Sequence, residues 1–209
     1  FPWDSEFVPV EMEMMSKDDL TLVPLTRELI EPTIAMCGEC VGKNLYTEKM
    51  LLKALEQPEQ KFLLLVTPEN KPVAYLYIRL IGIEEAEQIA KLSLSKLKEL
   101  TGKDTPLIGN MQSIGVLPEY RNHDISKYLI ELGLQWLTEE TEADIAFGVC
   151  WKPHGKVPVE KTVKSFGFSH LADSRRVWYD RTDLICPVCK GRCECDAAIY
   201  YKRLDRRGV

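Results

Sequence analysis

The stretch over residues 108–141 changes the spacing of its hydrophobic positions halfway along. Its first part is a run of apolar and β-branched residues that ends before Pro118, and a short run of this kind predicts a strand. Its second part carries apolar residues at helical spacing with polar residues between them, which predicts an amphipathic helix. The apolar positions of this helix are Ile125, Leu129, Leu132 and Trp136. The pattern therefore predicts a strand, a tight loop and a helix in succession.

Before this unit, the pattern predicts strands and helices in a regular order. Thr26 is placed to cap the first helix, and Pro32 is expected to interrupt that helix and kink it. A second helix stops before Pro58, and two strands rich in leucine, valine and tyrosine flank a turn that contains proline and asparagine. The elements are a strand from residue 20, helices over about 27–41 and 47–57, a hairpin over 61–82 and one helix over 84–103.

After the unit, the chain returns to alternating patterns. Ile145, Phe147 and Val149 alternate along a predicted strand over 143–151, as in a strand that is buried on one face. A short helix follows, and then two antiparallel strands joined by a cysteine-rich loop. These last elements lie over about 157–165, 175–184 and 197–204, with the loop over 186–195. The complete order predicts an α+β fold, an α/β sandwich of one sheet with flanking helices.

Length and composition limit the number of domains. With 209 residues, of which 45% are hydrophobic, the chain is long enough for one well-buried domain, which we expect over residues 19–209. Residues 1–18 mix proline with acidic residues. We interpret them as an arm that docks on the domain or as sequence added for expression.

Charge and hydropathy argue against several kinds of partner. The net charge of -5 and the pI near 5.4 do not favour a nucleic-acid-binding surface. No window approaches the ~20 continuous apolar residues of a membrane helix. The N-terminal segment lacks the basic and apolar regions of a secretory signal. We therefore expect no nucleic-acid or membrane partner, a cytoplasmic location, and a monomer or a homodimer.

The loop between the central strand and helix carries the first candidate chemistry. The first backbone N–H groups of a helix have no partner within it and lie at the positive end of its dipole, so they form a natural seat for phosphate. Arg121, His123 and Lys127 surround these groups with side chains that can carry positive charge. The alternative is a purely structural turn, in which Asp124 or Ser126 caps the helix.

Residues 118–130 resemble the acyl-CoA loop of the GNAT superfamily of N-acyltransferases. In that family, a strand ending in Val-x-Pro is followed by Arg or Gln, two residues, Gly, one residue, and Gly or Ala. The matching positions are Arg121, Ile125 and Lys127. Asp124 and Ser126 stand where the small residues are usual. A side chain at position 124 limits the approach of a pyrophosphate to the backbone, and its carboxylate repels phosphate unless it points away.

The segment Phe166-Gly167-Phe168 resembles the end of the last helix of GNAT proteins. A tyrosine four residues before that glycine often serves there as the general acid, and Val163 occupies the equivalent position. The order of elements from about residue 19 to 204 also agrees with the GNAT fold. That fold is a mixed, mostly antiparallel sheet flanked by helices, to which this chain adds an inserted helix before the central strand.

The resemblance implies an acetyl-CoA-dependent N-acetyltransferase, which moves an acetyl or related acyl group directly to a small-molecule or peptide amine. The alternative, suggested by the departures at Asp124, Ser126 and Val163, is a coenzyme-binding or regulatory module that lacks catalysis. The residues implied to bind the coenzyme are Ile114, Gly115, Val116, Arg121, Asn122, His123, Asp124, Ile125, Ser126 and Lys127.

Four residues are candidates for acid–base chemistry. Glu119 and Gln112 lie near the central strand, where a base for the attacking amine is needed. Tyr46 and Tyr179 are candidate acids by their positions in the resembled fold. A structural role is the alternative for each of them, because no motif supports any of the four.

The cysteines form the second candidate site. They are seven in number and clustered, which is typical of thiols or metal ligands in a reducing compartment rather than of a secreted disulfide framework. Two cysteines three residues apart, followed by Lys190 and Gly191, have the form of a zinc knuckle. The candidate zinc ligands are Cys186, Cys189, Cys193 and Cys195, or Cys37 and Cys40 together with Cys186 and Cys189. Disulfides and free thiols are the alternatives.

Overall fold

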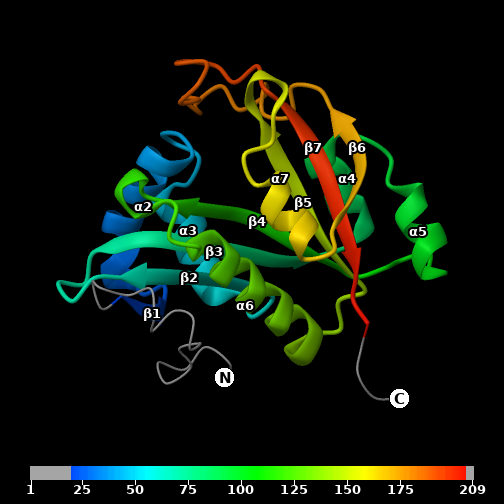
Figure 1. Ribbon diagram of the computed structural model, residues 1–209, viewed down its shortest axis with the longest axis horizontal. Helices are drawn as coiled ribbons and strands as arrows, with labels where there is room; N and C mark the ends of the chain where they lie inside the picture. The colour runs from blue at the N-terminus through cyan, green and yellow to red at the C-terminus, as the bar shows by residue number, and fades with distance from the viewer. Residues whose placement is uncertain (1–19, 206–209) are drawn as a thin grey trace.

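The computed structural model describes residues 20–205, so the interpretation of residues 1–18 lies outside the described range. Its centre is a seven-stranded sheet in the order β1-β2-β3-β4-β5-β7-β6 (Figure 1). The strands are β1 (Thr21–Pro24), β2 (Gln60–Val66), β3 (Pro72–Ile81), β4 (Ile108–Val116), β5 (Ile145–Lys152), β6 (Ser169–Ser174) and β7 (Asp196–Arg203). The helices are α2 (Ile30–Cys40), α3 (Glu48–Glu56), α4 (Ile83–Ala90), α5 (Ser95–Thr101), α6 (Ile125–Glu140) and α7 (Glu160–Ser165), with 3₁₀ turns at Arg27–Leu29, Pro118–Tyr120 and Pro153–Gly155. Within the described range, none of these helices has the length and apolar composition needed to cross a bilayer.

Neighbouring strands run antiparallel, except for β4 and β5, which are parallel. The predicted α+β fold with a mixed, mostly antiparallel sheet is confirmed. Residues 108–110 of β4 pair with residues 145–147 of β5, and beyond them the two strands diverge (Figure 1). The sheet therefore opens into a V between β4 and β5.

Helices cover both faces of the sheet, because the side chains of each strand alternate between the faces. A Cβ added at Gly133 of α6 would lie 2.8 Å from Ile78 of β3, so α6 packs closely on that face. On the opposite face, a Cβ added at Gly115 of β4 would lie 2.3 Å from the ring of Tyr75 and 2.9 Å from Cys40 at the end of α2. Hence α6 and α2 lie on opposite faces of the half of the sheet that contains β3 and β4.

The other half of the sheet is covered by α4 and α5 on one face and by α7 on the other. Ile145 and Phe147 are fully buried in a cluster with side chains of α4 and α5, and Val149 packs against it. Their predicted alternation is thus confirmed. Ala146, which points the other way, belongs to the main core together with Val163 of α7.

Two helices replace the single helix predicted over 84–103. The chain leaves α4 at Lys91, whose φ of 56° is left-handed, before α5 begins. The carboxylate of Glu87 stabilises the break by accepting a hydrogen bond of 2.8 Å from the N–H of Leu94. Apolar side chains on both sides of the break reach the same cluster, which is why the spacing suggested one continuous helix.

The strand predicted over 175–184 is wrong. β7 pairs with β5 on one edge and with β6 on the other, and β6 ends at Ser174, so residues 175–184 form a loop. Val177 and Leu184 are buried in this loop although they have no strand partner. The apolar residues of this segment, a run from Val177 to Tyr179 and then Leu184, therefore reflect the packing of a loop against the domain.

The first predicted helix is a 3₁₀ turn followed by α2. Pro32 lies in the first turn of α2, where backbone N–H groups have no partner within the helix, so it marks the start of α2 instead of kinking its interior. In the described chain, Thr26 makes no side-chain capping bond. Thr47, by contrast, caps α3 by accepting a hydrogen bond of 3.4 Å from the N–H of Met50.

Candidate functional site: a cavity in the V of the sheet

A cavity of about 670 Å³ occupies the space where β4 and β5 diverge. Residues 111–116 of β4 and 148–151 of β5 form its sides. On one face of the sheet it is bordered by α6 and α7, and on the other by the end of α2 and the loop that precedes β7. The cavity therefore passes through the sheet, and its volume suits a cofactor-sized ligand.

A β-bulge in β4 lies beside this cavity. Tyr77 of β3 pairs with Ser113, whereas Arg79 pairs with Asn110, so β4 has one more residue than β3 between these pairs. On its other edge β4 pairs with β5 only as far as residue 110, among the residues that the structure describes. The backbone groups on that edge over residues 111–116 are therefore not used by a neighbouring strand and face the cavity.

The loop between β4 and α6 contains two left-handed residues, Asn122 with a φ of 66° and Asp124 with a φ of 56°. Asp124 stands at the N-cap position of α6, but its side chain makes no capping bond there, so the interpretation of Asp124 as a capping side chain is wrong. Glycine adopts this conformation without strain, which explains the usual residue at this position of the resembled loop. Nε of Arg121 donates a 3.0 Å hydrogen bond to the carbonyl oxygen of Val116 and so ties the loop to β4.

The residues expected to bind a coenzyme line the cavity, with the exception of His123, which is exposed outside it. Arg121 and Lys127 contribute positive charge at the N-terminus of α6. Within the described lining, Asp124 is the one carboxylate. This end of the cavity combines free backbone donors with basic side chains, and such a combination favours an anionic group.

The structure brings two of the four acid–base candidates to the cavity. Gln112 lines it, and its Oε1 accepts a 2.8 Å hydrogen bond from Nδ2 of Asn110. Tyr46 also lines it, and burial raises the pKa of this phenol well above its usual range. Glu119 and Tyr179 are not part of the described lining, and the Tyr179 ring instead stacks under the guanidinium of Arg192, at 3.7 Å from ring centroid to Cζ.

A cluster of hydroxyl groups surrounds Ser113, which the sequence did not single out. The hydroxyls of Tyr75 and Ser113 lie 2.6 Å apart, and the Tyr46 ring packs edge-on against that of Tyr75 with a centroid distance of 6.3 Å. Ser113 lines the cavity from the bulged part of β4. Its role could not be predicted, because the bulge sets the direction of its side chain and no sequence signal marks the bulge.

Val163 and Tyr200 line the cavity on the side of α7. The hydroxyl of Tyr200 donates a 2.9 Å hydrogen bond to Oε1 of Glu160, and burial is the main cause that raises the pKa of Tyr200. Tyr200 lies opposite Gly148 in the pairing of β5 with β7. This placement depends on the strand register, so sequence spacing could not reveal that Tyr200 reaches the cavity.

Two thiols in the lining are unsuited to nucleophilic catalysis. Burial raises the pKa of Cys40 to about 11 and the pKa of Cys150 to about 12. Both are therefore protonated at neutral pH, whereas a nucleophilic cysteine needs a depressed pKa. The cavity is consistent with chemistry that does not pass through a covalent cysteine intermediate.

An arch formed by residues 41–45 and 181–185 spans the cavity on the face of the sheet that carries α2. The N–H of Ile185 donates to the carbonyl of Lys43 at 3.0 Å, in an isolated β-bridge. Nδ2 of Asn44 donates to the carbonyl of Asp183 at 2.9 Å. Nη2 of Arg181 donates to the carbonyls of residues 44 and 45 at 3.0 and 3.1 Å. The arch thus joins segments that are about 140 residues apart in the chain.

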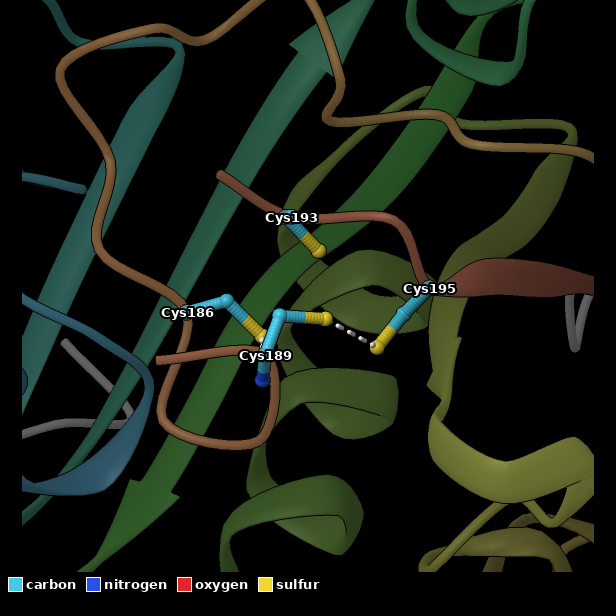
Figure 2. Close-up of side chains that lie close together, drawn as sticks. All are labelled: Cys186, Cys189, Cys193 and Cys195. Atoms are coloured by element: carbon cyan, nitrogen blue, oxygen red, sulfur yellow. Dashed lines mark hydrogen bonds between the residues drawn. The ribbon is translucent and has the colours of Figure 1, made fainter. Parts of the chain in front are cut away.

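Four cysteines converge next to the arch. Cys186, Cys189, Cys193 and Cys195 place their Sγ atoms within 4.8 Å of one another, and all four point into a common space (Figure 2). Sγ of Cys189 lies 3.7 Å from Sγ of Cys195, and none of the seven cysteines forms a disulfide. The first of the two predicted ligand sets is therefore assembled, whereas Cys37 and Cys40 do not join this cluster.

The backbone around the first two cysteines is arranged as in a metal knuckle. The N–H of Cys189 donates to Sγ of Cys186, and the N–H of Glu194 donates to Sγ of Cys189, each at 3.5 Å. Lys190 adopts a left-handed conformation, and its N–H donates to the carbonyl of Cys186 at 2.8 Å. Backbone donors directed at sulfur stabilise thiolates.

Comparisons with known proteins give the fold but no family assignment by sequence. No family model and no curated protein matches the chain. Many solved structures match its fold.

Three acetyltransferases illustrate the structural likeness. NAA60 of Arabidopsis thaliana, solved with a bisubstrate analogue, matches with a TM-score of 0.64 and 11% identity over 89% of this chain and 98% of its own. The ribosomal-protein-S18-alanine N-acetyltransferase of Escherichia coli matches with a TM-score of 0.59 and 13% identity over 90% and 96%. The spermidine/spermine N-acetyltransferase SpeG of Vibrio cholerae matches with a TM-score of 0.59 and 11% identity over 88% and 93%. The chain therefore has the GNAT fold.

Proposed function

We propose that the protein is an acetyl-CoA-dependent N-acetyltransferase that transfers an acetyl group directly to an amine. The observation that carries this proposal is the cavity, because it joins a helix N-terminus suited to a phosphate group to an unpaired strand edge within the V of a GNAT fold. Solved structures of the same fold include NAA60 with acetyl-CoA. The acceptors named for the similar enzymes are a protein alanine and polyamines, so the fold itself accommodates peptide and small-molecule amines.

In the proposed complex, the N–H groups of residues 122–127 hold the pyrophosphate, and Arg121 and Lys127 add positive charge. The pantetheine arm lies along the free edge of β4. A backbone N–H near the bulge then polarises the thioester carbonyl. The amine nitrogen attacks the carbonyl carbon, the C–N bond forms, the C–S bond breaks, and coenzyme A leaves as a thiolate.

Few side chains of the cavity can accept or donate a proton in this reaction. The attacking amine must lose a proton, and within the described lining the one carboxylate, Asp124, lies at the coenzyme end. We assign this step to water and to desolvation of the amine, which lowers the pKa of an ammonium group. Val163 cannot protonate the leaving thiolate, so that proton comes from water or from the hydroxyl of Tyr200, which lines the same side of the cavity.

Calorimetric titration with acetyl-CoA tests the coenzyme site directly. We expect saturable binding of one molecule per chain, together with release of coenzyme A when a suitable amine is added. Absence of heat at millimolar acetyl-CoA would refute the proposal. Binding without turnover over a broad amine panel would instead favour a coenzyme-binding module without catalysis, which is the second candidate because Val163 replaces the usual acid.

The substitution Asp124→Gly is expected to tighten acetyl-CoA binding and to stabilise the fold by about 0.5–1 kcal/mol, because glycine adopts the left-handed conformation without strain. The φ of 56° at this residue and its missing cap bond motivate the change. Asp124→Asn is the matched control, since asparagine tolerates the same conformation but carries no charge. If both variants bind equally tightly, charge accounts for the gain, and if the glycine variant binds more weakly than wild type, Asp124 assists the site.

We also propose that the four clustered cysteines bind a structural zinc ion. Four thiolates in tetrahedral arrangement are a common ligand set for structural zinc, and the Sγ atoms already lie close enough to share one ion. The N–H groups that point at Sγ of Cys186 and Cys189 donate hydrogen bonds to these sulfurs and so orient them as ligands. Reduced cysteines of this kind are also what a cytoplasmic protein retains.

Elemental analysis of protein purified under reducing conditions, without added metal, tests the zinc proposal. We expect about one zinc ion per chain, and its loss in the double variant Cys186→Ser, Cys189→Ser. The double variant Cys40→Ser, Cys150→Ser is the matched control and should retain the zinc, because neither residue belongs to the cluster. A metal-free protein in which all seven thiols react with a thiol reagent would contradict the proposal.

A further inference from the structure

The cavity has two chemically different openings. On the face of α6, its lining carries Arg121, Asp124 and Lys127 and the free N–H groups of the helix N-terminus. On the face of the arch, its lining residues are apolar side chains, hydroxyl groups and the sulfurs of Cys186 and Cys193, which belong to the cysteine cluster, and none of them is a carboxylate. Lys43, Arg181 and the other charged side chains of the arch do not belong to the described lining. If the coenzyme occupies the first opening, the second is left for the acceptor.

Apolar side chains from three separate segments form the acceptor opening. They are Val41 and Leu45 from the loop after α2, Trp151 from β5, and Trp178 and Leu184 from the loop before β7. Leu45, Trp151 and Trp178 pack against the cluster that contains the cysteines, so the cysteine loop holds this wall in place. The wall is thus a preformed apolar surface, and a ligand that covers it gains from the hydrophobic effect.

Polar groups at the acceptor opening are concentrated at one place. Ser113 and Tyr46 present hydroxyls at the bulge of β4, and the Ser113 hydroxyl lies 2.6 Å from that of Tyr75. A nitrogen placed beside Ser113 would lie next to the free edge of β4, where the thioester carbonyl is expected. The group attached to that nitrogen would then extend against the apolar wall.

We infer that the acceptor is a primary amine whose neighbouring group is apolar and uncharged, such as an arylalkylamine or the α-amine of a peptide with an apolar first side chain. A polyamine is disfavoured, because its second ammonium group would be desolvated against tryptophan and leucine side chains without a carboxylate partner. This inference rests on the proposed acetyltransferase function and specifies the acceptor of the same site.

Conjugates of coenzyme A test this inference even if turnover is slow. In each, the sulfur carries a CH₂–CO–NH–R group, where R is 2-phenylethyl in one and 6-aminohexyl in the other. Calorimetry should show that the phenylethyl conjugate binds about tenfold more tightly than coenzyme A, because its ring buries apolar surface on the wall. The aminohexyl conjugate, which ends in an ammonium group, should bind no more tightly than coenzyme A.

Variants at Leu45 separate charge from shape. Leu45 lines the cavity and is only partly buried, so a polar residue can be placed there with little disturbance of the core. Leu45→Glu should tighten binding of the aminohexyl conjugate and weaken binding of the phenylethyl conjugate. Leu45→Gln should also weaken binding of the phenylethyl conjugate, but it should not tighten binding of the aminohexyl conjugate. Unchanged thermal midpoints and coenzyme A affinity would show that both variants fold.

Two results would overturn the inference while leaving the proposed function intact. The first is a phenylethyl conjugate that binds no more tightly than coenzyme A, and the second is an aminohexyl conjugate that binds more tightly than the phenylethyl one. If coenzyme A and both conjugates fail to bind at millimolar concentration, the proposed function itself is refuted and the inference is refuted with it.

Discussion

Joint replacement of Cys186 and Cys189 by serine is expected to lower the free energy of unfolding by about 3 kcal/mol or more. The loop over 186–195 has few apolar side chains, and the residues that it buries are mainly the cysteines themselves. Its ordering entropy must therefore be offset by something other than hydrophobic burial. The proposed zinc ion would offset it through its binding free energy, and without two of its ligands the ion would be lost.

Urea unfolding with zinc present and with a chelator present measures this effect. Wild type should lose stability when the chelator is added, whereas the double serine variant should be equally unstable in both conditions. Limited proteolysis should cut the variant within residues 186–195 first, because that segment loses its cross-link. Equal stability of wild type with and without the chelator would contradict the prediction.

The substitution Gly115→Ala is expected to destabilise the protein by about 2–3 kcal/mol, because the core around this residue is already full. A Cβ at this position would lie 2.3 Å from the ring of Tyr75. That ring cannot move away easily, since it is fully buried, stacks on Phe62 with a centroid distance of 5.4 Å and has its hydroxyl 2.6 Å from Ser113. We also expect weaker coenzyme binding, because Gly115 lies on the β4 edge of the cavity.

Gly148→Ala is the matched control for this prediction. Gly148 lies on β5, on the other side of the same cavity, but a Cβ there would meet its nearest neighbour, Sγ of Cys150, at an ordinary distance of 3.7 Å. We expect the free energy of unfolding of the Gly148→Ala variant to stay within about 0.5 kcal/mol of the wild-type value. Chemical denaturation of the two variants side by side is the measurement. If Gly115→Ala lowers the free energy of unfolding by less than about 1 kcal/mol, the core around β3 and β4 can rearrange to accept the methyl group.

The parts of the fold that local spacing determines could be predicted from the sequence. The strand before Pro118, the amphipathic helix that begins at Ile125 and the alternation at Ile145 all follow from side chains that meet one core, and the structure has them. The break at Lys91 was missed because apolar residues on both sides of it reach the same cluster. In residues 175–184, a short run of β-branched and aromatic residues packs as a loop, and such a run alone cannot be distinguished from a strand.

The parts of the site that depend on pairing could not be predicted. Tyr200 reaches the cavity through its register against β5, and Ser113 through the bulge in β4. Neither the register nor the bulge leaves a mark in the spacing of residues. The loop around Asp124 was identified because its chemistry is local, but the absence of a capping bond is a matter of backbone conformation. The grouping of Cys193 and Cys195 with Cys186 and Cys189 could be predicted, because the four residues are close in sequence.

The V of the sheet is joined at its narrow end and bridged near its wide end. At the narrow end, residues 108–110 pair with residues 145–147, and the bridge is the arch between residues 41–45 and 181–185. If β4 and β5 were joined only at the narrow end, the angle between them could change. A second connection near the wide end restricts that angle. The cysteine cluster connects the end of the arch segment to the start of β7, so it helps to set the width of the gap between β4 and β5. Loss of the cluster would thus act at a distance on the rigidity of the sheet, without removing any group from the part of the lining that the β4–α6 loop forms.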